Sequence, residues 1–175
     1  MKLKYCIFAA LFAALTFVAT AFAQIPLAGA GYVHLGDTFV LLSALVLPLP
    51  YALVASALGA ALADIAASYV AYAPITAVVK ALMVLVMWLL CRNKHDWLHL
   101  VTAFVCATLT LGAGYFVYEA FALGMPVALA DLPFNLLQGA VCSVPAFVVY
   151  KLVGNRLRSA VLADVDDTAD DSSQK

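Results

Sequence analysis

Long apolar runs, separated by short segments that contain proline, glycine or charge, limit most strongly how this chain can fold. Hydrophobic residues make up 66% of the 175 residues and charged residues only 11%. A helix that crosses a bilayer needs about 20 mainly apolar residues. The sequence therefore predicts an all-α integral membrane protein in the cell membrane. It should be a bundle of six transmembrane helices, placed at 4–23, 36–49, 51–71, 74–91, 98–122 and 132–154.

Two of these runs allow a second interpretation. The run 36–49 is short and ends at a Pro-Leu-Pro turn, so it is either a tilted partial span or a helix that begins earlier. The first run follows two lysines and ends in Ala-Phe-Ala, which also resembles a secretory signal with its cleavage site. Its apolar stretch, residues 5–23, is longer than the usual signal core of about 7–15 residues, so we expect a retained span.

The placement of charge predicts the topology. With both termini in the cytoplasm, nearly every basic residue lies on the cytoplasmic side, as membrane proteins prefer. These residues are Lys2, Lys4, the 92–95 loop, Lys151, Arg156 and Arg158. Five of the ten acidic residues lie between Asp164 and Asp171. We therefore expect a transmembrane domain at 1–158 and an acidic, disordered cytoplasmic tail at 159–175.

Several classes of partner find no support in the sequence. The net charge is −1, and the basic residues form no patch that could neutralise a nucleic-acid backbone. The four cysteines are scattered through apolar segments without C-x-x-C spacing, so we expect buried thiols and no bound metal or cofactor. His95 and His99 have the i, i+4 spacing of metal ligands, but they flank Trp97, and a solvated face at the membrane surface is the favoured interpretation.

Polar residues inside the predicted spans fall in the outer half of the bundle. They are His34, Asp37, Asp64, Lys80, Glu119, Asn135 and Gln138. A charge within a membrane costs about 2.5–3.5 kcal/mol on insertion scales, so several charges at one level require partners or a wet cavity. A ligand site is the first hypothesis. The alternative is that Lys80 pairs with Asp64 or Glu119 only to hold helices together.

Aromatic residues occur at the same level, namely Tyr32, Tyr69, Tyr72, Tyr115, Tyr118 and Phe134. Their rings could stack on a flat heterocycle. Tyrosines are also common at membrane surfaces in any membrane protein. The inner half, by contrast, has almost no ionisable residue between Lys80 and Arg92. A transporter without a polar inner path must rock as a body or depend on a partner.

Several stretches resemble the S components of energy-coupling factor (ECF) vitamin transporters, in the riboflavin-type group. The most specific is Gly31-Tyr32-Val33-His34-Leu35-Gly36-Asp37. Others are Gly59 to Asp64, Tyr72 to Thr76 with Lys80, Gly114 to Glu119 and Pro133 to Gly139. The similarity extends from about residue 8 to residue 150.

The resemblance implies a substrate-binding subunit that takes a vitamin or vitamin precursor from outside and topples within the membrane to release it. Its partners would be a transmembrane coupling protein and two ATPase subunits, with ATP hydrolysed in the ATPases. Riboflavin, vitamin B6 forms and pyrimidine precursors of thiamine are all substrates of related members. The small residues at i, i+4 spacing in the first helix, Ala9, Ala10, Ala13 and Ala14, would meet the coupling protein.

The polar residues of the outer half, the aromatic residues at the same level and the family resemblance together predict one set of substrate-binding residues. It consists of Tyr32, His34, Asp37, Asp64, Tyr72, Lys80, Tyr115, Glu119, Asn135 and Gln138. A stand-alone carrier remains an alternative, although the chain has neither an internal repeat nor a continuous polar pathway. A membrane-embedded enzyme would use Asp64, Glu119 or His34 as acid or base. No catalytic motif supports an enzyme, so no catalytic residue is predicted.

Overall fold

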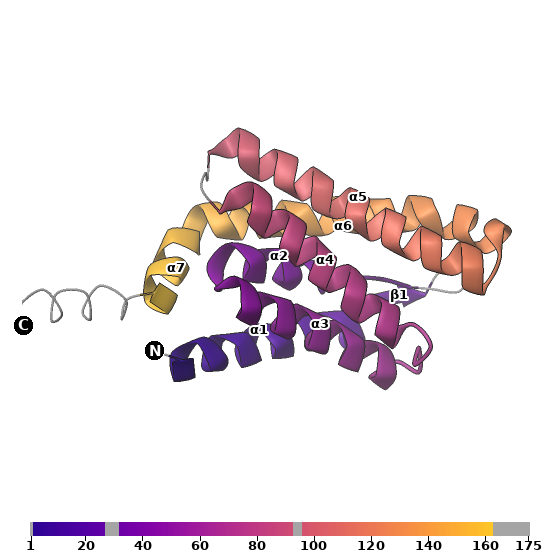
Figure 1. Ribbon diagram of the computed structural model, residues 1–175, viewed down its shortest axis with the longest axis horizontal. Coiled ribbons are helices and arrows are strands. Elements are labelled where there is room, and N and C mark those ends of the chain that lie inside the picture. Colours follow the sequence, from indigo (N-terminus) through magenta and orange to yellow (C-terminus); the bar gives the residue numbers. More distant parts are fainter. Residues whose placement is uncertain (1, 27–31, 93–95, 163–175) are drawn as a thin grey trace, which may run out of the picture.

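The computed structural model describes residues 2–26, 32–92 and 96–162, which form a bundle of helices with a small hairpin at one end (Figure 1). The elements in chain order are α1 (Lys2–Phe22), β1 (Gln24–Pro26), β2 (Tyr32–His34), α2 (Asp37–Val46), α3 (Leu49–Ala66), α4 (Ala73–Cys91), α5 (Trp97–Ala122), α6 (Met125–Val149), the π-helical turn η1 (Tyr150–Gly154) and α7 (Asn155–Leu162).

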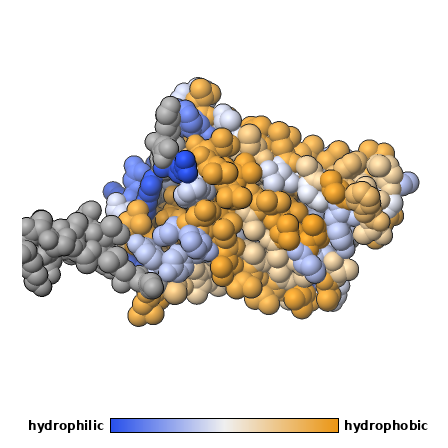
Figure 2. All heavy atoms as spheres, in the orientation of Figure 1, coloured by the Kyte–Doolittle hydropathy of each residue, from blue (hydrophilic) through white to orange (hydrophobic). Residues whose placement is uncertain are grey.

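Five helices in the described part of the chain are long and apolar enough to cross a membrane. They are α1, α3, α4, α5, and α6 with its continuation to Leu162. Apolar residues cover the middle of the molecule, while hydrophilic residues gather at the end that carries α7 (Figure 2). The predicted all-α membrane fold is therefore confirmed.

The helix α2 is the exception, because it has only ten residues. At 1.5 Å per residue it is about 15 Å long, roughly half the apolar thickness of a bilayer. It lies in the centre of the bundle, where Val40 and Leu41 are almost fully shielded by the other helices. The partial-span interpretation is correct, and the helix does not begin in the stretch before Leu35.

The hairpin of β1 and β2 was not predicted from the sequence. The two strands pair antiparallel, with Gln24 opposite His34 and Pro26 opposite Tyr32. The hairpin joins α1 to α2 at the end of the bundle opposite α7 (Figure 1). It brings Tyr32 and His34 over the interior of the bundle.

The helix α6 begins at Met125, earlier than the predicted start at residue 132. Pro126 occupies its first turn, where a missing N–H costs nothing. Gly124, with a φ of +100°, makes the turn from α5. Pro133 lies inside the helix and does not mark its beginning, so the turn before it, including Asp131, is helical.

The helices α1 and α3 pack closely through small residues. A Cβ atom added to Gly59 would lie 2.5 Å from the backbone oxygen of Ala13, so only glycine fits there. Ala9 is buried and Ala13 half-buried, whereas Ala10 and Ala14 are exposed. The four alanines of the predicted partner surface therefore divide between an internal contact and an outward face.

The helix α1 begins and α7 ends at the same end of the bundle (Figure 1). This agrees with termini on one side of the membrane, although which side is cytoplasmic stays a prediction. The ordered helix continues past the expected domain boundary at 158 to Leu162. Most of the acidic tail, together with Gly31 and His95, lies outside the described residues.

Candidate substrate-binding site

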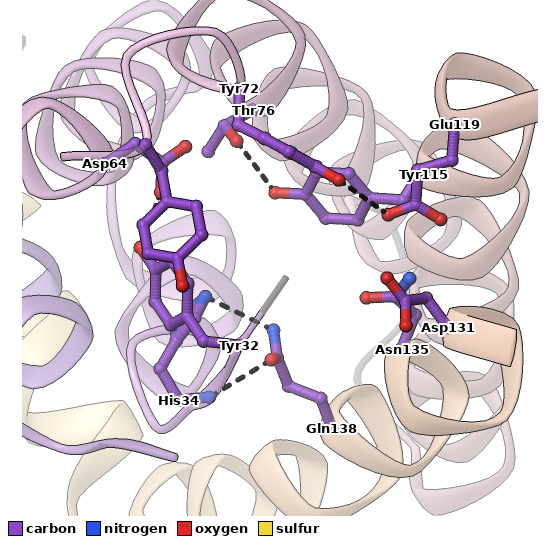
Figure 3. Close-up of a pocket in the computed structure, with 11 residues that line it drawn as sticks. Tyr32, His34, Asp64, Tyr72, Thr76, Tyr115, Glu119, Asp131, Asn135 and Gln138 are labelled. Carbon is purple, nitrogen blue, oxygen red and sulfur yellow. Dashed lines mark hydrogen bonds between the residues drawn. The ribbon is translucent and has the colours of Figure 1, made fainter. Parts of the chain in front are cut away.

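A polar cavity lies at the hairpin end of the bundle, with a free volume of about 30 Å³ (Figure 3). The strand β2, the helices α3 to α6 and the α3–α4 turn all contribute to it. Its lining residues are Tyr32, His34, Asp64, Tyr69, Tyr72, Thr76, Tyr115, Glu119, Asp131, Asn135 and Gln138. This space is too small for an organic ligand, so the lining side chains have to move apart when one binds.

Beneath the cavity, a buried ion pair joins two helices. Lys80 Nζ on α4 lies 2.6 Å from Asp37 Oδ1 on α2, and both side chains have 0% exposure. Gln138 Nε2 on α6 donates to the other carboxylate oxygen, Asp37 Oδ2, at 2.6 Å. The carboxylate of Asp37 therefore connects three helices, and its negative charge neutralises that of Lys80.

Gln138 also connects this ion pair to the hairpin, because the backbone N–H of His34 donates to Gln138 Oε1 at 3.1 Å. The ring of His34 accepts a hydrogen bond at Nδ1 from the N–H of Gly36, at 3.1 Å. Thr20 Oγ1 on α1 lies 3.4 Å from the same Nδ1. Burial lowers the pKa of His34 to about 4, so its ring is neutral at physiological pH.

One wall of the cavity is built on Tyr32 and Asp64. The hydroxyl of Tyr32 donates to Asp64 Oδ1 at 2.5 Å, which joins the hairpin to α3. The ring of Tyr69 packs against the ring of Tyr32, with centroids 4.7 Å apart. Aromatic faces and a carboxylate thus occur side by side on this wall.

The opposite wall comes from α4, α5 and α6. The Tyr72 hydroxyl donates to Glu119 Oε1 at 3.4 Å, and the hydroxyls of Thr76 and Tyr115 lie 2.9 Å apart. Asp131 and Asn135 lie near Glu119 on the same side of the cavity, facing Asp64 and Tyr32 across it (Figure 3).

The three α6 residues share one helix face because they are spaced at i, i+4 and i+7. Asp131, Asn135 and Gln138 are all buried, with exposures of 1%, 9% and 2%. An α-helix has about 3.6 residues per turn, so side chains at this spacing lie on one side of the helix. The face continues toward the other end of the bundle with Cys142, whose thiol donates to the His34 carbonyl at 3.3 Å.

Two carboxylate oxygens of the cavity have incomplete hydrogen bonding. Glu119 Oε2 is buried and has no hydrogen-bond partner among the described residues. Asp64 Oδ2 is also buried and makes no hydrogen bond of normal geometry with the described residues, although Thr76 lies beside it. Buried polar atoms without partners are costly, so a ligand or water that supplies donors would stabilise them.

The structure brings together most of the predicted substrate-binding residues. Those that line the cavity are Tyr32, His34, Asp64, Tyr72, Tyr115, Glu119, Asn135 and Gln138. Asp37 and Lys80 are not part of the lining, but Asp37 binds Gln138, and Lys80 Nζ lies 5.4 Å from the ring centroid of Tyr115. The assignment of substrate contacts to all ten residues stays a prediction.

The alternative in which Lys80 pairs with Asp64 or Glu119 named the wrong partners, because the ion pair is formed with Asp37. Two of the aromatic residues also lie outside the lining. Tyr118 donates to the carbonyl of Ala71 at 2.9 Å and packs on Tyr72, while Phe134 is 41% exposed.

The cavity also contains Asp131, which the sequence reasoning missed. Placing the start of the last span at residue 132 left Asp131 in a loop. Its spacing from Asn135 and Gln138 is the signal that could have placed it on the same face. Tyr69 and Thr76 also line the cavity, although neither was in the predicted binding set.

Long apolar helices around a buried cavity of tyrosine, carboxyl and amide groups define a membrane protein that binds a small molecule. Residues 1–155 match the family described as ECF-type riboflavin transporter, S component. The chain belongs to this family, as its resemblance implied, and is an integral membrane, substrate-binding subunit for a vitamin-type ligand. Comparison with curated protein sequences gives no significant match. S components associate with the partner subunits of an ECF module, and theirs is a transporter family and not an enzyme family.

Proposed function

We propose that this chain captures a vitamin or vitamin precursor from outside the cell and delivers it inward by toppling within the membrane, driven by ATP hydrolysis in its partner subunits. The candidate substrates are riboflavin, vitamin B6 forms and thiamine precursors. The observation that carries the proposal is the confinement of the polar cavity to the hairpin end of the bundle.

The other half of the bundle offers no polar route among the described residues. Between the Lys80 level and the α7 end, α4 and α5 bury apolar side chains such as Met83, Met87 and Leu100, each with 0% exposure. The buried hydroxyls of Ser43 and Ser56 bind each other at 2.9 Å. A polar ligand could not pass through this core, so movement of the whole subunit against a partner is the favoured mechanism.

The outward face of α1 is the proposed contact with the coupling protein. A groove of about 420 Å³ runs between α1 and α3 and is lined by Ala9, Ala10, Ala13 and residues of α3. Small side chains allow another helix to approach closely in a membrane, where packing drives association. Ala10 and Ala14 are the exposed members of the predicted partner surface.

Reconstituted vesicles test the proposal. We expect radiolabelled riboflavin, pyridoxine, pyridoxamine or a pyrimidine precursor of thiamine to be taken up only when the coupling protein, both ATPases and ATP are present. Binding of the same compound should need this subunit alone. ATP-dependent uptake that disappears with a hydrolysis-deficient ATPase would support the proposal.

The two alternatives predict different results in the same experiment. A stand-alone carrier would transport without the other subunits or ATP. An enzyme would convert the compound, which mass spectrometry of the vesicle contents would detect. Either result would contradict the proposed function.

A further inference from the structure

We propose that the cavity selects a cationic ligand, namely a flat aromatic heterocycle that carries a protonated amine or a positively charged ring nitrogen. The inference rests on the proposed function and narrows its substrate class. It follows from the acidic residues of the cavity lining, from two carboxyl oxygens that make no hydrogen bond of normal geometry with the described residues, and from the aromatic surfaces between them.

The lining contains three carboxyl groups and no lysine or arginine among the described residues. Asp64, Glu119 and Asp131 all border the cavity. The one imidazole, His34, is fully buried and neutral, because burial lowers its pKa to about 4. The nearest cation is Lys80, and it does not line the cavity. The lining therefore contains more acidic than basic side chains.

Lys80 does not offset this excess, because its charge is matched by Asp37 at 2.6 Å. Asp37 takes a second hydrogen bond from Gln138, so the ion pair is satisfied without any cavity carboxyl. An anionic cavity in a low-dielectric bundle is costly unless a positive charge enters it. A cationic ligand would therefore stabilise the ionised form of these carboxyl groups.

The geometry also favours an aromatic cation. Asp64 lies on one wall, and Glu119 with Asp131 lies on the other (Figure 3). The ring of Tyr32 belongs to the first wall, and those of Tyr72 and Tyr115 belong to the second (Figure 3). The ring of Tyr69 packs against that of Tyr32. Tyrosine faces attract cations, and they stack on flat rings. A heterocycle between the walls could direct an ammonium group toward Glu119 and Asp131 while its ring contacts the tyrosines.

The incomplete hydrogen bonding of Glu119 and Asp64 also favours a cationic ligand. Glu119 has 1% exposure and Asp64 has 4%, and each has one carboxylate oxygen with no hydrogen bond of normal geometry among the described residues. A carboxylate accepts hydrogen bonds and cannot donate them. A ligand edge that presents N–H groups satisfies these oxygens, whereas an edge of carbonyl oxygens repels them. The cavity is therefore better matched to an amine-bearing ring than to a neutral ring with carbonyl groups.

Two matched pairs of compounds test the inference by titration calorimetry at pH 7 with the full chain in lipid nanodiscs. Pyridoxamine and pyridoxine differ in one aminomethyl or hydroxymethyl group, and thiochrome is the neutral, ring-closed oxidation product of the cation thiamine. We expect the cationic member to bind at least tenfold more tightly in at least one pair, and more tightly than riboflavin. The proposal is overturned if riboflavin or the neutral members bind as tightly, or if neither cation binds.

Charge-removing variants test which groups recognise the cation. Glu119→Gln and Asp64→Asn keep the shape of each side chain and should reduce the preference for the cationic member by tenfold or more. Asp96→Asn makes the same chemical change at the other end of α5, where Asp96 contacts His99, and should leave the preference unchanged. An unchanged preference in both cavity variants, with thermal unfolding showing that they are folded, would overturn the assignment.

The result separates this inference from the proposed function. If riboflavin is taken up with the coupling module while the cationic compounds neither bind nor compete, the transport function holds and the cationic substrate class is wrong. If the cationic compounds bind but no uptake depends on ATP and the partner subunits, the substrate class holds and the transport mechanism is wrong.

Discussion

Lys80 and Asp37 form an ion pair that is sealed inside the bundle, with Nζ 2.6 Å from Oδ1 and no exposure of either side chain. The pair joins the long helix α4 to α2, which is too short to cross the membrane by itself. Gln138 adds α6 to the same junction. The ion pair beneath the cavity is therefore a buried contact that holds three helices together, and it is not an exposed charged surface.

Breaking this pair should strongly destabilise the protein. Lys80→Met leaves the Asp37 carboxylate buried beside Gln138 alone, and removing one partner of a buried pair typically costs about 3–5 kcal/mol. Thermal unfolding of the purified protein measures the loss. Lys80→Met combined with Asp37→Leu removes both charges and should recover much of the stability. A double variant as unstable as the single one would contradict the isolated-pair interpretation.

Removing the Tyr32 hydroxyl should weaken ligand binding. Tyr32→Phe loses the 2.5 Å hydrogen bond that holds the carboxylate of Asp64, and hydrogen bonds to charged groups contribute about 1.5–3 kcal/mol. We expect at least a tenfold rise in the Kd of the bound compound, measured by calorimetry. The matched control is Tyr118→Phe, whose hydroxyl binds the Ala71 carbonyl outside the cavity. Equal effects of the two variants would argue against a binding role for Tyr32.

Bulky side chains on the outward face of α1 should block transport without affecting binding. Ala10→Leu and Ala14→Leu change exposed positions, so the fold and the cavity should stay intact. Uptake in vesicles that contain the complete ECF module should fall to background, while the Kd of the isolated subunit stays the same. Ala113→Leu places the same bulk on an exposed position of α5 and should transport normally. Normal uptake by the α1 variants would remove this face from the partner contact.

Acid should destabilise the protein through His34. Its pKa in the folded protein, about 4, lies below the ordinary histidine value of 6.5 because of burial. As the pH falls below about 6.5, the unfolded chain takes up a proton that the folded chain rejects, so stability is lost between about pH 6.5 and pH 4. Unfolding temperatures measured across this range should fall less steeply for His34→Gln. Identical slopes for the two proteins would exclude His34 as the acid-sensitive group.

The sequence predicts most of the site because ionisable residues are rare within apolar spans. Asp64, Lys80 and Glu119 stand out for this reason alone, and the cost of burying charge implies that they have partners nearby. Which partners they have depends on the rotation and neighbours of each helix. The pairing of Lys80 with Asp37 follows from the central position of α2, and hydropathy does not reveal that position.

Two features were not predicted from the sequence, the hairpin and the position of Asp131, and each has a physical explanation. A strand of three residues such as Tyr32–His34 is too short to show a pattern of alternation. Asp131 was left outside the predicted span 132–154 because spans were placed on apolar runs, and a charged residue interrupts such a run. In α6 the helix continues through Pro133.

The orientation of the cavity tests the central claim most directly. A single cysteine at Phe121, a 90% exposed position near the hairpin end, can be compared with one at Ser159 in α7, after replacement of the four native cysteines. A membrane-impermeant maleimide added to intact cells should label the Phe121→Cys protein and leave the Ser159→Cys protein unlabelled until the cells are opened. Labelling of the Ser159 position alone in intact cells would place the cavity on the cytoplasmic side and contradict capture from outside.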